Sequence, residues 1–166
     1  MTRSRLLVID ANVLIDFRAA DPDVLALVAK HLGVVHVPRA VIDEVPGLTP
    51  AECQLLGVAV VTPETAQPLE ASGRRGRLSF ADHLCLVLAR DGDWACVTND
   101  RALREGCAQE SIETVWGLEL MLNLVGKRQL PPGRAVAIAR KIHEENPRHV
   151  TQAVLIQFIR LARRRR

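Results

Sequence analysis

The chain has 166 residues, of which 48% are hydrophobic and 25% charged, and its formal net charge is +3. A chain of this length encloses one α/β core and is too short for two domains of ordinary size. No apolar run approaches the ~18 residues of a membrane-spanning helix, so we expect no helical span. The first apolar run, residues 6–9, is also too short for the core of a signal peptide, which predicts a cytoplasmic protein.

The charge is distributed unevenly along the chain. Residues 148–166 contain six arginines and no acidic residue, whereas the preceding residues contain 16 Lys and Arg against 19 Asp and Glu. A basic tail on a mildly acidic body suits a polyanion held beside a site that itself needs carboxylates. The alternative interpretation of the final four arginines, residues 163–166, is a solvated chain end.

Taken in chain order, five short apolar runs predict strands buried on both faces of a parallel sheet. They are residues 6–9, 34–37, 58–62, 94–98 and 112–116. Helix-start signals lie between them, at Asp21-Pro22, at Thr49-Pro50, and at Ser79 with Asp82 in capping-box spacing. This alternation predicts a three-layer α/β/α fold with a central, mostly parallel sheet of about five strands.

After residue 117 the pattern changes to helices alone, predicted over residues 118–128, 132–145 and 151–163. We therefore divide the chain into an α/β domain over residues 1–125 and a C-terminal helical extension over residues 126–166 that packs on the same domain. Residues 64–78 are predicted to form one long loop, and long loops in compact domains are often functional.

Four acidic residues follow the predicted strands or begin a helix near them. Asp10 comes directly after the first strand, Asp100 shortly after the fourth, and Glu44 lies in a short helix predicted after the second. Asp82 lies on the helix that begins at Ser79, on a stripe that is otherwise apolar. Because ligands bind beyond the carboxyl ends of strands in open parallel sheets, we predict that these four carboxylates converge.

Converging carboxylates require a compensating cation, because two charges ~4 Å apart repel by roughly 4 kcal/mol at an effective dielectric near 20. Oxygen ligands without paired His or Cys favour Mg²⁺ or Mn²⁺ over zinc. Such a centre activates water and polarises a phosphodiester, which predicts hydrolysis of a nucleic-acid backbone. Each acid also has a structural interpretation: Asp82 and Asp100 are placed to cap helices, Asp10 to form an Asx-turn, and Glu44 to be solvated.

Four segments resemble the signature segments of PIN-domain proteins, in particular the VapC-type toxins of bacterial toxin–antitoxin pairs. They are residues 7–15 with Asp10 and Asn12, residues 37–45 with Glu44, residues 79–82 with Asp82, and residues 97–104 with Thr98-Asn99-Asp100. The resemblance covers about residues 6–125, and its D-x-N and T-N-D-x-x-L motifs are specific together and weak singly.

The resemblance implies a PIN-like fold in which the four acidic residues bind Mg²⁺ or Mn²⁺ and the attacking water. It implies three residues that orient those carboxylates by hydrogen bonds: Asn12, Thr98 and Asn99. It further implies a cytoplasmic endoribonuclease that leaves a 5′-phosphate on cleaved RNA. For toxin members it implies a homodimer that is blocked by a small antitoxin protein whose tail enters the pocket.

Other readings of these motifs are weaker or remain open. A haloacid-dehalogenase-type phosphatase needs D-x-D, and its second acid is replaced here by Asn12, which cannot donate a proton as an acid. A receiver-type phosphoacceptor domain needs an acidic pair before Asp10 and a lysine after the last strand, and the sequence has neither. A non-catalytic PIN-like module that binds RNA or a protein partner remains the alternative. The chain also runs some 40 residues past Gly126, longer than many compact toxins, so toxin status is more open than nuclease chemistry.

Several side chains outside the acidic set also carry expectations. Four arginines are expected to contact RNA phosphates: Arg74, Arg75, Arg77 and Arg101. His83 adjoins Asp82, but adjacent helix positions point about 100° apart, so we expect it at the surface or beside the metal ligands. Trp94 and Trp116 are expected in the core. The four cysteines lack zinc-site spacing and are expected to be buried free thiols.

Overall fold

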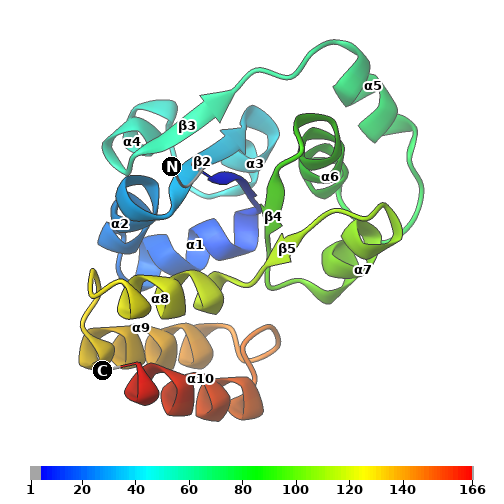
Figure 1. Cartoon of the computed structure of the whole chain (residues 1–166). Coiled ribbons are helices and arrows are strands. Elements are labelled where there is room, and N and C mark those ends of the chain that lie inside the picture. The colour runs from blue at the N-terminus through cyan, green and yellow to red at the C-terminus, as the bar shows by residue number, and fades with distance from the viewer. Residues whose placement is uncertain (1–4, 166) are drawn as a thin grey trace.

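The computed structural model describes residues 5–165, so Met1–Ser4 and the last arginine of the basic tail, Arg166, lie outside the described residues. The centre of the fold is a five-stranded, all-parallel sheet in the order β3-β2-β1-β4-β5 (Figure 1). The strands are β1 Arg5–Ile9, β2 Gly33–Pro38, β3 Val58–Val61, β4 Ala95–Val97 and β5 Thr114–Val115. The predicted α/β fold with a parallel sheet of five strands is confirmed.

Helices connect the strands and cover the sheet. The first seven are α1 Ala11–Ala20, α2 Asp23–His31, α3 Arg39–Glu44, α4 Pro50–Leu55, α5 Ala66–Gly73, α6 Phe80–Gly92 and α7 Arg101–Gln109. Helix α6 packs against β1, β2 and β4 and also contacts α3, whereas α2 packs against β2 and β3. Leu7, Val8 and Ile9 of β1 are completely buried, because the apolar run of this strand lies in the middle of the sheet.

The C-terminal part of the chain is a group of three helices, α8 Gly117–Gly126, α9 Pro132–Glu145 and α10 Gln152–Arg164. Figure 1 shows them stacked on one side of the molecule, coloured yellow to red. Helix α9 packs on α1 and α8, and α10 packs on α8 and α9. Their buried residues, such as Ile142 and Phe158, belong to the same hydrophobic core as β1.

Several expectations need correction. The segment predicted as one long loop, residues 64–78, contains helix α5, whose Ala71 packs with Leu84 and Leu88 of α6 in a small apolar cluster. Helix α1 follows β1 with no intervening loop, and the sequence patterns did not predict it.

Two other findings agree with the sequence. Within residues 5–165 no helix is both long and apolar enough to cross a bilayer. The four cysteines are buried and free.

The two tryptophans are less buried than expected, although Trp94 packs against the hydrophobic core. Both tryptophans are only half-buried. Trp94 stacks on the ring of His36 with the centroids 4.2 Å apart, and Trp116 lies under the guanidinium of Arg104. His83, expected at the surface or beside the metal ligands, is 7% exposed, because the loop before α6 and helix α7 cover it.

Candidate functional site

The candidate site lies where the strand order reverses. The chain passes from β1 to β2 and β3 on one side and returns to β4 and β5 on the other. Open α/β sheets bind ligands at this switch point, outside the carboxyl ends of the strands. Ile9 pairs with Val97, and the backbone N–H of Asp10 donates to the carbonyl of Val97 at 3.1 Å. This register places Asp10 beside the residues that follow β4.

Asp10 is completely buried and is held by hydrogen bonds. Its carboxylate accepts one from the Thr98 hydroxyl and one from the backbone N–H of Val13, at 2.9 Å, as the N-cap of α1. Burial raises the pKa of Asp10 to about 7, against the opposing effect of these two hydrogen bonds. The negative charges of Asp82 and Asp100 raise this pKa further.

Asp100 joins Asp10 through Thr98, because the backbone N–H of Asp100 donates to the Thr98 hydroxyl oxygen at 3.0 Å. The Asp100 side chain is the N-cap of α7 and accepts from the backbone N–H of Leu103 at 2.8 Å. Thr98 itself is completely buried. The hydroxyl therefore ties the two segments of the site into one hydrogen-bonded chain.

Asp82 reaches the same edge of the sheet from α6. It completes the capping box with Ser79: the Asp82 backbone N–H donates to the Ser79 hydroxyl at 3.1 Å, and the Ser79 backbone N–H donates to the Asp82 carboxylate at 3.2 Å. Burial and the charge of Asp100 raise the pKa of Asp82, although the hydrogen bonds from Ser79 oppose the shift. Asp82, Asp100 and Asp10 thus lie within electrostatic reach of one another.

Glu44 lies at the rim of this group. It is the last residue of α3, which packs against α6, and its side chain is exposed. Burial raises its pKa, the nearby Ser79 side chain lowers it, and the charge of Asp82 raises it. Glu44 is therefore coupled to Asp82, at the opening of the site.

The carboxylates do not form a ready-made metal cage. Within residues 5–165, no three Asp, Glu, His or Cys side chains are placed to hold one ion. Three of the acids instead have local structural partners, since Asp10 and Asp100 cap helices and Asp82 completes a capping box. Both interpretations of these residues, a structural cap and a site carboxylate, are compatible with their positions.

The three residues expected to orient the carboxylates have different surroundings. Thr98 donates to Asp10. Asn99 is buried, and its side-chain oxygen accepts from the backbone N–H of Gly117 at 2.9 Å, at the start of α8. Asn12 is half-buried on α1, and no hydrogen bond in the described part of the chain joins its side chain to the acids. Asn99 therefore anchors the C-terminal helices beside the site.

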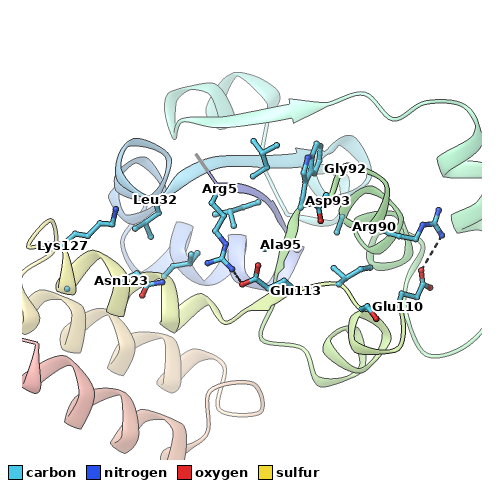
Figure 2. Close-up of a pocket in the computed structure, with 18 of the residues that line it drawn as sticks. Arg5, Leu32, Arg90, Gly92, Asp93, Ala95, Glu110, Glu113, Asn123 and Lys127 are labelled. Atoms are coloured by element: carbon cyan, nitrogen blue, oxygen red, sulfur yellow. Dashed lines mark hydrogen bonds and ion pairs between the residues drawn. The ribbon is translucent and has the colours of Figure 1, made fainter. Parts of the chain in front are cut away.

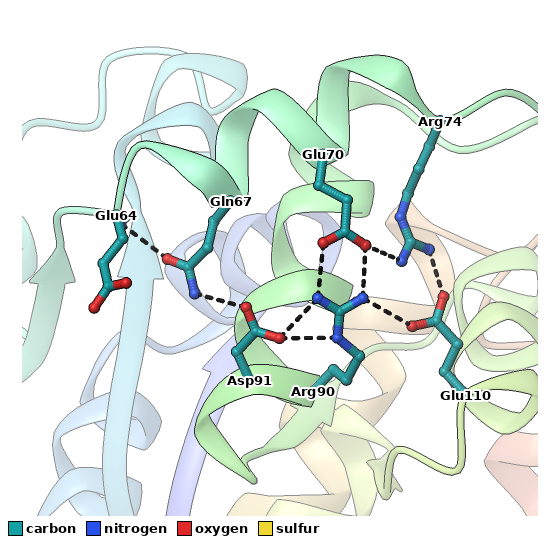
Figure 3. A network of polar contacts seen from close by, with 7 residues as sticks. All are labelled: Glu64, Gln67, Glu70, Arg74, Arg90, Asp91 and Glu110. Carbon is teal, nitrogen blue, oxygen red and sulfur yellow. Dashed lines mark hydrogen bonds and ion pairs between the residues drawn. The ribbon is translucent and has the colours of Figure 1, made fainter.

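The arginines expected to bind RNA are not equivalent. Figure 3 shows Arg74 held between Glu70 and Glu110, at 2.8 and 2.5 Å. Arg101 is exposed and pairs with Glu105 at 2.7 Å. Two others, Arg75 and Arg77, are exposed in the loop before α6. These two have no ion pair among residues 5–165 and are the arginines best placed for a ligand.

Arg104 is a residue beside the site that the sequence patterns did not identify. It donates to the carbonyl of Asn99 at 2.7 Å, and its guanidinium lies 3.6 Å from the centre of the Trp116 ring. Burial lowers its pKa, and the charge of Asp100 opposes that effect. The i+4 spacing from Asp100 at the start of α7 was the available signal.

A cavity of about 880 Å³ lies elsewhere in the molecule. Figure 2 shows Arg5 and Glu113, an ion pair, and Asp93 and Lys127 among its lining residues. None of the four acids lines it, and it adjoins the chain segment before Arg5 that is not described. Volume alone therefore does not identify the site.

No known family model matches the chain, and no curated protein matches its sequence. The functional interpretation rests on the residues themselves and on where the fold places them.

Proposed function

We propose that the chain is a metal-dependent endoribonuclease that hydrolyses RNA phosphodiester bonds at the acidic group of Asp10, Glu44, Asp82 and Asp100. One observation carries the proposal: carboxylates from separate segments lie within electrostatic reach at the switch point of the sheet, and one of them, Asp10, is buried with a pKa of about 7. Titratable groups perturbed by burial and by one another are typical of functional sites.

The donor set fits a hard divalent cation by its chemistry, because it consists of carboxylate oxygens. Mg²⁺ usually keeps several waters and uses one or two protein carboxylates rather than a complete protein cage. One or two of the carboxylates of Asp10, Asp82 and Asp100 would hold each Mg²⁺ or Mn²⁺ ion. Each has one oxygen engaged by a backbone N–H, and the second oxygen of Asp10 accepts from Thr98. The bound ion would lower the pKa of a water and polarise the phosphodiester.

The protein side chains supply orientation and proton transfer. Thr98 holds the Asp10 carboxylate in one orientation and is itself fixed by the backbone of Asp100. Glu44, at the exposed rim and coupled to Asp82, is the carboxylate best placed to accept the proton of the attacking water. Arg104 places a cation beside Asp100, where it would lie near the substrate phosphate.

A PIN-type, VapC-like identity is part of the same proposal. It is supported by the four motif segments and by a sheet order, β3-β2-β1-β4-β5, that is compatible with a PIN-like fold. As the toxin of a type II toxin–antitoxin pair, the protein would form a homodimer and be blocked by a small antitoxin. Helices α9 and α10 would be the extension beyond the compact toxins.

A non-catalytic RNA- or protein-binding module is the second candidate. It is favoured by the capping roles of Asp10, Asp82 and Asp100, which account for the three side chains without any metal. It is also favoured by the lack of a three-ligand arrangement within residues 5–165.

Cleavage of a generic single-stranded RNA with Mg²⁺ or Mn²⁺ separates the two candidates. The variants Asp10→Asn and Asp100→Asn retain a capping side chain and remove the charge, so a loss of cleavage reports on the carboxylate rather than the cap. Glu44→Gln has a matched control in Asp43→Asn, the adjacent exposed acid that pairs with Arg39. We expect chelation and the three site variants to abolish cleavage, Asp43→Asn to retain it, and Ca²⁺ to bind without turnover. A folded wild type that never cuts would overturn the proposal.

A further inference from the structure

A second cavity, of about 380 Å³, lies on another side of α6 from the acidic group. The loop before α6, α6 itself and α7 form its walls, and none of the four acids lines it. Its volume is within the range of small-molecule pockets. It adjoins the candidate site because Asp82 and His83 are neighbours on α6.

His83 is the unusual side chain of this cavity. It lines the cavity and is only 7% exposed, yet neither ring nitrogen has a hydrogen-bond partner within residues 5–165. Buried polar groups without partners are rare and destabilising, and each one calls for an explanation. A ligand that hydrogen-bonds to the imidazole would supply the missing partner.

Part of the cavity wall is apolar, with aliphatic side chains and a glycine. It includes Leu78, Leu86, Ala102 and Gly106. A Cβ at Gly106 would lie 3.1 Å from the Leu86 side chain, so the glycine allows α7 to approach Leu86 of α6 closely. Such a wall suits the face of a flat ring better than a compact, strongly hydrated anion.

The polar part of the lining contains both donors and acceptors. Arg75, Arg77 and Gln109 offer donors. Glu105 and Glu110 offer the acceptor positions of their carboxylates that the pairs with Arg101 and Arg74 leave unused. A free phosphate is a compact anion, and here it would lie beside the carboxylates of Glu105 and Glu110. The edge of a nucleobase presents donors and acceptors together and can use both kinds of partner.

We propose that this cavity binds an unpaired nucleobase, with the attached phosphates toward the exposed Arg75 and Arg77. The base can belong to a single strand of RNA or to a free nucleotide. Asp82 and His83 are adjacent on α6 and point about 100° apart, so an RNA strand passing the start of α6 would reach both the acids and the cavity. As an RNA subsite the cavity depends on the proposed function, whereas nucleotide binding by itself does not.

Binding measured in EDTA tests the cavity without cleavage. The probes are a labelled single-stranded oligoribonucleotide, the four nucleoside monophosphates and inorganic phosphate. We expect at least one nucleotide or the oligonucleotide to bind, inorganic phosphate to bind far more weakly, and His83→Phe to weaken base binding by about tenfold or more. His83→Phe should fold at least as well as the wild type, because it removes two buried, unpartnered nitrogens.

Two further variants complete the test. Ala102→Leu fills the cavity and leaves His83 in place, so it should also abolish base binding. Arg75→Ala with Arg77→Ala should weaken binding in a salt-dependent way, whereas Arg160→Ala, an exposed arginine of α10, should have no effect. Equal binding by wild type, His83→Phe and Ala102→Leu, or no binding of any base, would overturn the inference.

The outcomes also separate the cavity from the nuclease. Metal-dependent RNA cleavage with no base binding would refute the cavity and leave the proposed function standing. Base binding without any cleavage would support the cavity and refute the nuclease. Binding of mononucleotides but not of the oligonucleotide would identify a free nucleotide as the ligand.

Discussion

The Thr98 hydroxyl donates a hydrogen bond to the completely buried carboxylate of Asp10. The same oxygen accepts from the backbone N–H of Asp100, so one side chain connects the ends of β1 and β4. A hydroxyl that bridges two site residues affects both the charge state of the site and the stability of the fold.

Replacing Thr98 by valine should be costly at neutral pH. The change keeps the shape of the side chain but leaves one oxygen of the Asp10 carboxylate and the Asp100 N–H without their partner. We expect a loss of about 1–3 kcal/mol in the free energy of unfolding, measured in urea at pH 8. Thr98→Ser keeps the hydroxyl and should retain most of the stability that Thr98→Val loses. Equal stability of the two variants would contradict the bridging role of the hydroxyl.

Asp10→Asn should stabilise the metal-free protein at high pH. The pKa of Asp10 is raised to about 7, so its contribution to stability is full below about pH 4 and is lost as the pH rises through 7. The shift corresponds to about 4 kcal/mol, and losing a hydrogen bond to an ionised group offsets part of it, leaving a net gain of about 1–2 kcal/mol. Urea unfolding in EDTA at pH 8 and at pH 4 measures the stability of the variant relative to the wild type. A gain in stability at pH 4 alone would contradict the prediction.

Asp16 should impose a second pH dependence. It is 7% exposed on α1, its Oδ1 accepts from Asn146 at 3.3 Å, and its Oδ2 has no partner within residues 5–165. Burial raises its pKa to about 6 against the effect of Asn146, with smaller contributions from His149, which lowers it, and Glu145, which raises it. The stability that neutral Asp16 contributes is therefore present below about pH 4 and is lost as the pH rises through 6.

The variant Asp16→Asn should remove that dependence. Its stability relative to the wild type should rise from near zero at pH 4 to a plateau above pH 6, with a gain of about 1–3 kcal/mol. Chemical unfolding at several pH values in EDTA measures the difference. A difference that stays flat with pH would show that Asp16 is ionised in the native protein across the whole range.

The ion-pair network of Figure 3 should contribute modestly to stability. Glu70 accepts from Arg90 at 2.6 and 2.7 Å and from Arg74 at 2.8 Å, and these arginines lower the pKa of Glu70 to about 2. Because the side chains of Glu70 and Arg90 are more than a third exposed, solvent screening limits the effect. Arg90→Met should lower the free energy of unfolding by about 0.5–1 kcal/mol, and the loss should be smaller in 1 M NaCl.

The network should also make the stability of the protein depend on pH. The pKa of Glu70 is lowered, so the stability that it contributes is present above about pH 4.5 and is lost as the pH falls toward 2. Arg39→Met, which removes a single exposed pair with Asp43, is the matched control and should change stability less. An equal effect of the two variants would mean that the network adds nothing beyond one pair.

Local patterns in the sequence were sufficient for most of the helices and strands. The apolar runs predicted all five strands, and the capping box at Ser79 predicted the start of α6 at the position where the structure places it. The candidate carboxylates could be named because each follows a strand or begins a helix. These features depend on residues a few positions apart, so they can be read along the chain.

The tertiary structure decided what depends on distant partners. The sequence could not show that α5 forms where a loop was expected, that His83 is buried under α7, or that Asp16 meets Asn146. The sequence offered capping roles for Asp82 and Asp100 and an Asx-turn for Asp10 only as alternatives. In the structure each of the three engages a backbone N–H, which keeps a structural and a functional role open for the same side chains. Apolar periodicity and caps act within one turn or strand, whereas burial and electrostatic coupling arise only when segments far apart in the chain pack together.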